Sequence, residues 1–412
     1  MDTQKQTEKV ILVGVSTYDH DDTEESVAEL AELCITADAE VVGELIQNRE
    51  QIHAATYLGK GKLLELKELI WECDATGIVC DDELSPVQLR NLSDELDVKV
   101  MDRTLVILDI FAKRAATAEG KIQVELAQLR YAQARLIGYG RSMSRLGGGI
   151  GTRGPGEKKL EVDRRTIKHR IAVLNQELNA VKKHREVTRQ QRERNHIPVA
   201  AIVGYTNAGK STLLNALTGS EVLSEDKLFA TLDPTTRLLE LPGKQQLLLT
   251  DTVGFIRKLP HHLIEAFRST LEEAKYADII IHVVDAANPQ MDHQMFVVYQ
   301  TLTELGVTDK PVVTLFNKQD LVEERQVLKD LKAQKTLEIS AKDGSGLLQL
   351  QEFLVKLLQE KNILIERLFS YETVNQLQII RKYGQMLQED YRENGIYVKA
   401  LVPKEWYEKV AK

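Results

Sequence analysis

The feature that most restricts this chain is the eight-residue stretch GYTNAGKS at positions 204–211. An apolar run at 199–203 precedes it and a helix-like run at 212–217 follows, so strand, glycine loop and helix come in that order. This is the context of a phosphate-binding loop, in which backbone N–H groups and the helix N-terminus attract phosphate. Lys210 is then expected to reach the β- and γ-phosphates, and the Ser211 hydroxyl to bind Mg²⁺. An accidental glycine turn is the alternative, and the loop alone does not identify the base.

Length and composition are those of an ordinary multidomain protein. The 412 residues predict two to four domains, and a hydrophobic content of 43% is sufficient for buried cores. No apolar run reaches about 18 residues, so we expect no transmembrane helix, and the polar start is unlike a secretory signal. The three cysteines lack C-x-x-C spacing, which argues against a metal site or a disulfide framework. The expected location is the cytoplasm.

The net charge of −8 is distributed unevenly along the chain. Residues 1–120 carry 11 Lys and Arg against 26 Asp and Glu, whereas residues 121–195 carry 18 against 7. A basic segment concentrated within an acidic protein indicates that this segment meets a polyanion.

Residues 1–119 are predicted to form an α/β domain, because short apolar runs alternate with helix-like segments. The expected strands are residues 10–15, 40–46, 77–80 and 98–101, and the expected helices are 23–34, 62–73 and 86–96. Ser85 and Pro86 form a good N-cap and first-turn pair. The stretch GKGK at 59–62 lacks the spacing of a phosphate loop, so we interpret it as a glycine turn opening a helix. Binding of RNA or nucleotide there is the weaker alternative.

Residues 120–196 are predicted to form a helical hairpin, because apolar residues recur at helical spacing on both sides of a glycine-rich segment. The segment between the helices, residues 138–156, is expected to be a non-helical loop. It carries Arg141, Arg145 and Arg153, and the coincidence of glycine with basic charge favours contact with RNA phosphates. A flexible loop with solvated charges is the alternative.

Residues 197–361 again alternate strand and helix, and strands apolar throughout predict a mainly parallel, doubly wound sheet covered on both faces. Residues 362–412 are predicted to form a small α+β module with a helix at 374–383. The turn signal Asn394-Gly395 indicates a hairpin there. This module carries no catalytic signature, so packing or docking is its expected role.

Four further motifs follow the phosphate loop, each at the end of an apolar run. In DTVG at 251–254, Asp251 is expected to hold Mg²⁺ and the Gly254 N–H to meet the γ-phosphate. In NKQD at 317–320, the carboxylate can accept two N–H groups of guanine that adenine does not offer, while the Lys318 stem covers the base. SAK at 340–342 can donate to guanine O6, and a threonine of FATLDPTT at 229–236 completes the Mg²⁺ shell. Together these motifs indicate a GTPase.

The position after DTVG predicts slow intrinsic hydrolysis. Small Ras-like GTPases have a water-orienting glutamine there, whereas this chain has Phe255, which neither donates nor accepts a hydrogen bond. Water must therefore be positioned by another group. Asn207 is a candidate K⁺ ligand, because some related loops of the form G-x-x-N-x-G-K-S coordinate K⁺. A tight-turn role for Asn207 is the alternative.

The chain resembles the HflX family of translational GTPases. The resemblance rests on the GTPase motifs, on residues 229–237 and 251–260, and most specifically on SRLGGGIGTRGPGEKK at 144–159. It implies an N-terminal α/β domain, a helical hairpin whose loop points into the large ribosomal subunit, and a GTPase domain. It also implies binding near the peptidyl-transferase centre and the splitting or rescue of stalled ribosomes.

The resemblance also assigns roles to individual residues. Ser211 and Asp251 are the Mg²⁺ ligands that the phosphate loop and the DTVG motif predict. By analogy with the F-x-T-L motif of Obg-type GTPases, the resemblance implies Thr231 as the Mg²⁺-binding threonine, with Thr235 as its competitor. The residues expected to act in catalysis are Lys210, Thr231 and Gly254. The nucleotide-binding set is Gly204, Tyr205, Thr206, Asn207, Ala208, Gly209, Lys210, Ser211, Thr212, Phe229, Ala230, Thr231, Leu232, Asp233, Asp251, Thr252, Val253, Gly254, Asn317, Lys318, Gln319, Asp320, Ser340, Ala341 and Lys342.

The expected partners are GTP and GDP and the large ribosomal subunit with its rRNA, with the protein itself a monomer. Two other functions are compatible with the same motifs. One is a ribosome-assembly or RNA-processing GTPase acting on a different RNA, and the other is a GTP sensor in which hydrolysis is incidental.

Overall fold

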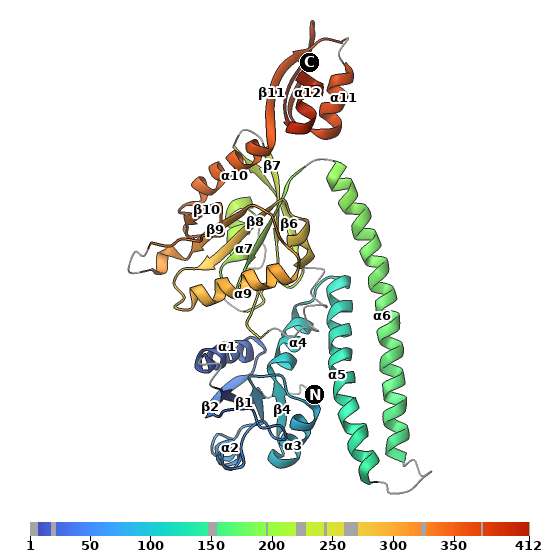
Figure 1. Cartoon of the computed structure of the whole chain (residues 1–412), viewed down its shortest axis with the longest axis vertical. Helices are drawn as coiled ribbons and strands as arrows, with labels where there is room; N and C mark the ends of the chain where they lie inside the picture. Colours follow the sequence, from blue (N-terminus) through green and yellow to red (C-terminus); the bar gives the residue numbers. More distant parts are fainter. Residues whose placement is uncertain are drawn as a thin grey trace, which may run out of the picture. The chain divides into compact units, whose positions relative to one another are not determined.

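The chain folds into two compact units (Figure 1). The computed structural model describes residues 7–17, 22–146, 155–194, 197–219, 228–242, 245–258, 271–322, 327–371 and 374–411. The first unit comprises Met1–Asn179 with Asp226–Leu232 and Ile256–Ser269, and the second comprises Ala180–Glu225, Asp233–Phe255 and Thr270–Lys412. The first unit is built around a parallel sheet, and the second contains a mainly parallel sheet and a smaller antiparallel one.

The sheet of the first unit has four parallel strands in the order β2-β1-β3-β4. These strands are β1 (Lys9–Ser16), β2 (Glu40–Asn48), β3 (Gly77–Cys80) and β4 (Lys99–Asp102). The helices that connect and follow them are α1 (Thr23–Thr36), α2 (Lys60–Glu72), α3 (Pro86–Leu96) and α4 (Arg103–Arg114). The apolar side chains of the central strands β1 and β3 are buried, as a parallel sheet covered on both faces requires.

Local sequence signals precede three of the helices of this unit. Ser85 caps α3 with a complete capping box, in which its hydroxyl accepts from Gln88 N and its own N–H donates to the Gln88 side chain. Helix α2 begins at Lys60 after Gly59, so the GKGK stretch opens a helix as predicted. Helix α4 follows β4 without a loop, because the Asp102 side chain accepts from Leu105 N and satisfies one of the first free N–H groups.

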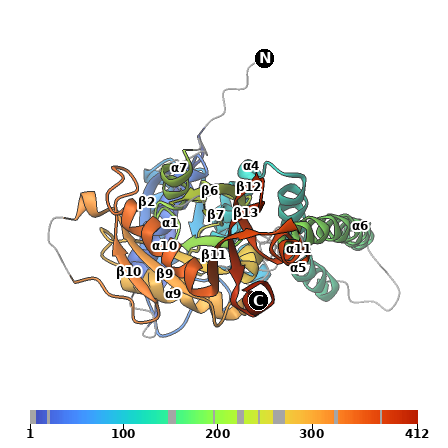
Figure 2. The ribbon, with the colours of Figure 1, turned by 90° about the horizontal axis from the view of Figure 1, so that it is seen from above.

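Helices α5 (Ala118–Leu146) and α6 (Pro155–Arg194) follow. They lie side by side in both views (Figure 1 and Figure 2), and the ion pair of Arg170 with Glu125 joins them. The prediction that residues 138–156 form a loop is wrong for 138–146, where α5 continues. Gly138 and Gly140 cost only about 1 kcal/mol each in a helix, and the residues that follow include the good helix formers Arg, Met and Leu. Pro155 occupies a first-turn position, where proline is tolerated.

The second unit contains a six-stranded sheet in the order β10-β9-β8-β5-β7-β6. Its strands are β5 (Val199–Gly204), β6 (Thr235–Leu241), β7 (Gln245–Asp251), β8 (Ile279–Asp285), β9 (Val312–Asn317) and β10 (Lys335–Glu338). Only the edge strand β6 is antiparallel. This mainly parallel sheet confirms the predicted fold class.

Helices cover both faces of the six-stranded sheet. Ile281 and Val283 share a core cluster with residues of α7 (Lys210–Thr218) and α10 (Leu347–Lys361). Between them, His282 packs against Tyr299 of α9 (Met291–Glu304). Because successive side chains of a strand point to opposite faces, α9 covers the face opposite α7 and α10. The sheet is therefore doubly wound.

The chain ends in a three-stranded antiparallel sheet with two helices. The sheet consists of β11 (Asn362–Phe369), β13 (Gly395–Pro403) and β12 (Gln385–Arg392), in that order. Helices α11 (Val374–Tyr383) and α12 (Lys404–Ala411) contribute to its core. The predicted hairpin at Asn394-Gly395 is present, whereas β11 and α12 were not predicted. Among the described residues, no helix combines the length and apolarity needed to cross a membrane.

Candidate functional site

The glycine loop connects the central strand β5 to α7, at the carboxyl edge of the six-stranded sheet. Strand β5 lies between β7 and β8, so the strand ends that carry the other motifs surround the loop. At the end of the loop, Gly209 has φ +93°, and a Cβ there would lie 2.3 Å from Asn317 Nδ2. Only glycine allows the loop to approach the NKQD motif this closely. A crevice at this edge of a parallel sheet is the usual ligand position of such folds.

Lys210 is folded back over the loop. Its side chain is buried, and Nζ donates to the Tyr205 carbonyl oxygen at 2.7 Å. Burial lowers the pKa of Lys210 to about 8, although the nearby Asp251 carboxylate acts in the opposite direction. A Cβ on Gly254 would lie 2.9 Å from Lys210 Nζ and 2.8 Å from Thr206 Cα. The phosphate loop and the DTVG motif are therefore in direct contact, with space for backbone alone between them.

Ser211 and Asp251 lie against each other. The Ser211 hydroxyl donates to Asp251 Oδ2 at 2.7 Å, and Asp251 is fully buried at the end of β7. Next to it, the Thr252 hydroxyl donates to the Ile202 carbonyl and ties the end of β7 to β5. A hydroxyl and a carboxylate oxygen that meet beside a buried lysine are donors of the kind that a hard divalent cation prefers, which takes its other ligands from water and phosphate. The residues present therefore fit Mg²⁺.

Asn317 joins three motifs that are distant in the sequence. Its Nδ2 donates to the Ala208 carbonyl of the phosphate loop at 2.8 Å, and its Oδ1 accepts from Ala341 N of the SAK motif at 2.9 Å. The Ser340 hydroxyl donates to Asp320 Oδ1 at 2.8 Å, which links the SAK motif to the NKQD motif a second time. The phosphate loop and the two predicted base-reading motifs thus form one connected site.

Asp285 belongs to this site and was missed by the sequence analysis. It ends β8, and its Oδ2 pairs with Lys318 Nζ at 2.7 Å. The signal that could have revealed it is positional. An aspartate closes an apolar strand between the strands of the DTVG and NKQD motifs, and the carboxyl ends of parallel strands share one sheet edge.

Phe255 is buried at only 2% exposure, and its backbone extends the pairing of β5 with β7. Thr206 N donates to the Phe255 carbonyl at 2.8 Å, and Phe255 N donates to the Gly204 carbonyl at 3.1 Å. The residue thus holds the DTVG motif against the phosphate loop through its backbone. Its side chain lies in the interior and cannot orient a water molecule.

The remaining predicted residues differ in burial and in the elements to which they belong. Thr212 continues α7, Val253 is buried, the Gln319 amide donates to the Phe316 carbonyl, and Lys342 is exposed. Ala230, Thr231 and Asp233 are half-buried, and Leu232 is buried. Thr235, the alternative to Thr231, is the register partner of Asp251 in the pairing of β6 with β7.

Phe229 and Thr231 lie in a segment that groups with the first unit. The Phe229 ring meets the Phe111 ring of α4 edge to face, with the ring centroids 4.7 Å apart. Beyond the DTVG motif, Lys258 also belongs to this unit and pairs with Asp81 at 2.5 Å and Asp82 at 2.8 Å.

Of the predicted RNA contacts, Arg141 and Arg145 lie on α5, and Arg153 lies outside the described residues.

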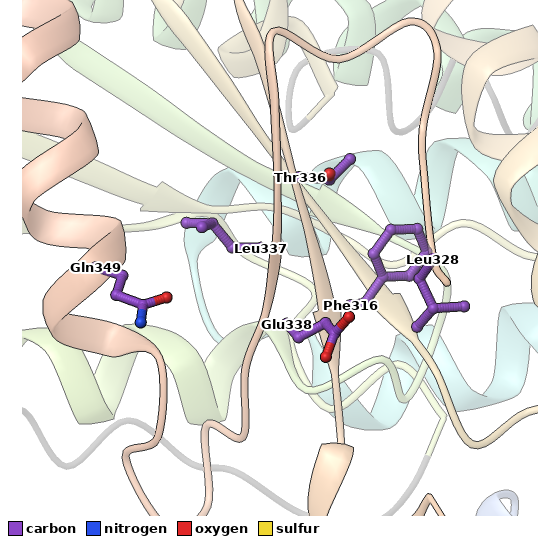
Figure 3. A pocket seen from close by; sticks show the side chains of 6 residues that line it. All are labelled: Phe316, Leu328, Thr336, Leu337, Glu338 and Gln349. Atoms are coloured by element: carbon purple, nitrogen blue, oxygen red, sulfur yellow. The ribbon is translucent and has the colours of Figure 1, made fainter. Parts of the chain in front are cut away.

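A groove of about 380 Å³ runs along the edge strand β10 and is separate from this site (Figure 3). Figure 3 shows the side chains that line it, which are Phe316, Leu328, Thr336, Leu337, Glu338 and Gln349. None of these residues belongs to a nucleotide motif.

Three family models match the chain in succession. A GTP-binding GTPase N-terminal model matches residues 24–112, a GTP-binding GTPase middle-region model matches 114–192, and a 50S ribosome-binding GTPase model matches 199–318. The third match contains the phosphate loop, the DTVG motif and Asn317.

The chain is also similar to curated proteins named GTPase HflX along most of its length. The protein from Lacrimispora saccharolytica is 65% identical over 98% of this chain and 96% of its own length. The protein from Caldanaerobacter subterraneus is 51% identical over 96% of this chain and 91% of its own length. The Escherichia coli protein is 40% identical over 85% and 83%, respectively.

Proposed function

Because this chain belongs to the HflX family of GTPases and is a GTP-hydrolysing enzyme, we propose that it is a switch controlled by the ribosome. Its GTP site is the group of connected motifs at the carboxyl edge of the six-stranded sheet. The observation that carries the assignment of the site is the pair of hydrogen bonds through which Asn317 joins Ala208 to Ala341. Because these bonds join the phosphate loop to the predicted guanine-reading residues, they support the binding of one nucleotide by both.

The phosphates bind to the loop at residues 204–211 and to the N-terminus of α7. Lys210 then exchanges the Tyr205 carbonyl for the β- and γ-phosphate oxygens, which restores the favourable environment for its charge that burial removes. Asp320 accepts the N1–H and N2–H₂ groups of guanine while its other contact, the Ser340 hydroxyl, keeps the carboxylate oriented. The Gly254 N–H, next to Lys210, meets the γ-phosphate.

Ser211 and Asp251 would hold Mg²⁺, with Thr231 as the third ligand and Thr235 as its competitor. When bound, the ion neutralises charge that develops on the phosphate oxygens during transfer. The contact of Ser211 with Asp251 supports this assignment, because both oxygens already face the same point beside the phosphate loop. Asn207, at φ +60° in the loop, is the candidate ligand for K⁺.

Hydrolysis in the free protein is slow in this proposal, because the Phe255 side chain is buried and supplies no water-orienting group. Activation comes from the large ribosomal subunit, which orders the segments around Thr231 and Phe255 at the γ-phosphate. The match to the 50S ribosome-binding GTPase model supports this choice of partner. The cellular role is the splitting or rescue of stalled ribosomes by a cytoplasmic monomer.

The test is single-turnover GTP hydrolysis with and without purified large subunits, in KCl and in NaCl. Stimulation by large subunits on the order of 10³–10⁵-fold is expected, as for other activating partners. Lys210→Ala serves as the inactive control. Rapid hydrolysis by the free protein in NaCl would contradict the proposal. Equal stimulation in both salts would remove the K⁺ role of Asn207 and retain the ribosomal partner.

Co-sedimentation tests the RNA contacts at the end of the helical hairpin. Changing Arg141, Arg145 and Arg153 to Ala is expected to weaken binding to large subunits and to leave GTP affinity unchanged. A matched control removes three basic side chains of the first sheet's helices, Lys67, Arg90 and Lys113. Equal binding by both triple variants would contradict the assignment, and binding to another RNA instead of large subunits would favour the RNA-processing alternative.

A further inference from the structure

Lys318, the second residue of the NKQD motif, is anchored by a carboxylate from the neighbouring strand. Its Nζ pairs with Asp285 Oδ2 at 2.7 Å, and the two side chains are only 23% and 15% exposed. The backbones around them are also joined, because Asp285 is the register partner of Asn317 and Ala286 N donates to the Asn317 carbonyl at 3.0 Å. The ion pair therefore connects two strand ends whose relative position is already fixed.

The backbone conformation of Lys318 is fixed, so only the side chain remains to be oriented. The residue has φ +64°, and hydrogen bonds on both sides hold this left-handed conformation. Gln319 N donates to the Ile339 carbonyl at 3.2 Å, and Leu321 N donates to the Lys318 carbonyl at 2.9 Å. The direction of the Cα–Cβ bond is thus set, whereas a free lysine stem would still sample many rotamers.

The carboxylate of Asp285 is itself held in place. Its Oδ1 accepts from Ala287 N at 3.0 Å, which leaves Oδ2 directed at Lys318. An asparagine at this position would keep an oxygen for Ala287 N and remove the charge that attracts the ammonium group. The chain thus offers a substitution that separates the turn contact from the ion pair.

We propose that Asp285 is a positioning residue for nucleotide binding, which acts through Lys318 by holding its stem against one face of the base. This inference rests on the proposed GTP site. A stem packed on the plane of a purine contacts the ring and does not read its edge. Asp285 therefore contributes to affinity for every purine nucleotide that the site accepts, whereas Asp320 decides which purine is preferred.

The test measures the affinities of the full-length protein for guanosine, inosine and xanthosine diphosphates by fluorescence titration. Asp285→Asn is expected to weaken all three by the same factor, about fivefold, because one long side chain must then be ordered during binding. Asp285→Glu, which keeps the charge, is expected to recover part of the loss. Asp278→Asn at the opposite end of β8, where Asp278 Oδ2 accepts from Val199 N, is the matched control and is expected to bind like the wild type.

A double-mutant cycle with Lys318→Met decides whether Asp285 acts through Lys318. If it does, Asp285→Asn has no further effect in the Lys318→Met background. Additive losses, an unchanged affinity, or a loss confined to one base would overturn the inference. If Asp285→Asn lowers the melting temperature, the double-mutant cycle is repeated with Asp285→Glu in place of Asp285→Asn, and that cycle decides whether Asp285 acts through Lys318. Failure of the wild-type protein to bind guanosine diphosphate would instead overturn the proposed GTP site.

Discussion

The two parallel sheets of this chain both place acidic side chains at the carboxyl ends of their strands, but they pair them differently. In the four-stranded sheet, Asp81 follows β3 and Asp102 ends β4, and each pairs with a buried or half-buried arginine. In the six-stranded sheet, Asp251 and Asp285 face a hydroxyl and an ammonium group of the nucleotide motifs. The same strand-end position thus stabilises the fold in one sheet and contacts the predicted nucleotide motifs in the other.

Arg103 shows how the first sheet uses its charges. Its guanidinium donates to Asp81 Oδ1, Glu29 Oε1 and the Ser26 carbonyl, and it is almost completely buried. Burial alone would raise the pKa of Asp81, but Arg103 and Lys258 outweigh burial and hold that pKa below its ordinary value. The charged groups around Arg103 are thus paired with one another. In the second sheet, Asp251 and Asp285 are instead paired with Ser211 and Lys318, two residues of the predicted nucleotide motifs.

Of the substitutions that test this difference between the sheets, Arg103→Met is expected to have the largest effect, a loss of stability in the first sheet. It leaves Asp81, at 1% exposure, with Lys258 as its remaining cation, and breaking a buried pair in this way costs about 3–5 kcal/mol. Urea unfolding and hydrogen exchange of β1 and β3 should show the loss, while the affinity for guanosine diphosphate stays unchanged. Lys67→Met, which breaks an exposed pair with Glu95, is the control and should cost under about 1 kcal/mol. Similar losses in both variants would contradict the structural role of Arg103.

Asp320→Asn is the corresponding test of the second sheet, where the change should weaken nucleotide binding and leave stability unaltered. Loss of charge-assisted hydrogen bonds to guanine should cost about 2–5 kcal/mol of GTP binding, while the Ser340 contact and the stability persist. Competition titrations with GTP and xanthosine triphosphate check the result, with Asp343→Asn as a nearby exposed control. Unaltered GTP affinity would show that another group reads the base.

His282 provides a pH test of the second sheet. It is buried in β8 beside Tyr299, and burial lowers its pKa to about 4 from 6.5, with Lys210 acting in the same direction and Asp330 against it. The unfolded chain therefore takes up more protons than the folded one between pH 6.5 and 4, so stability falls as the pH drops through this window.

Between pH 7 and pH 5 the loss due to His282 is about 2 kcal/mol. Hydrogen exchange of β8, corrected for intrinsic rates, should show this decrease in the wild type, and His282→Leu should show a correspondingly smaller one. Identical pH dependence in both proteins would mean that other groups control acid unfolding of this sheet.

Lys258→Gln is expected to have the smallest effect. Lys258 contacts Asp81 and Asp82, but its side chain is 31% exposed, and solvent screening reduces such a pair to about 1 kcal/mol. Slightly faster hydrogen exchange in β3 is the expected result. A loss as large as that of Arg103→Met would mean that the two cations share the role of neutralising Asp81, and no change would assign it to Arg103 alone.

Much of the fold was predictable where local signals coincide. The apolar runs of β1, β3, β8 and β9, the Ser85 cap and the Asn394-Gly395 turn agree with their observed elements. Prediction failed where tertiary packing overrides local preference. Strand β6 was not predicted, and its first two residues end a motif that we interpreted only as a metal-binding segment. Residues 138–146 are helical despite their glycines.

The sequence by itself determined the order and chemistry of the motifs, because a glycine loop, a carboxylate or a hydroxyl has its properties wherever it lies. Only the tertiary structure decided which of them meet. Asn317 is 109 residues from Ala208 and 24 from Ala341, and Lys318 reaches Asp285 on another strand. Such contacts depend on strand order and on the common edge of a parallel sheet, which local propensity does not specify. The contact of Asp285 with Lys318 is of this kind: the position of Asp285 at a strand end can be seen in the sequence, but its partner is known only from the folded chain.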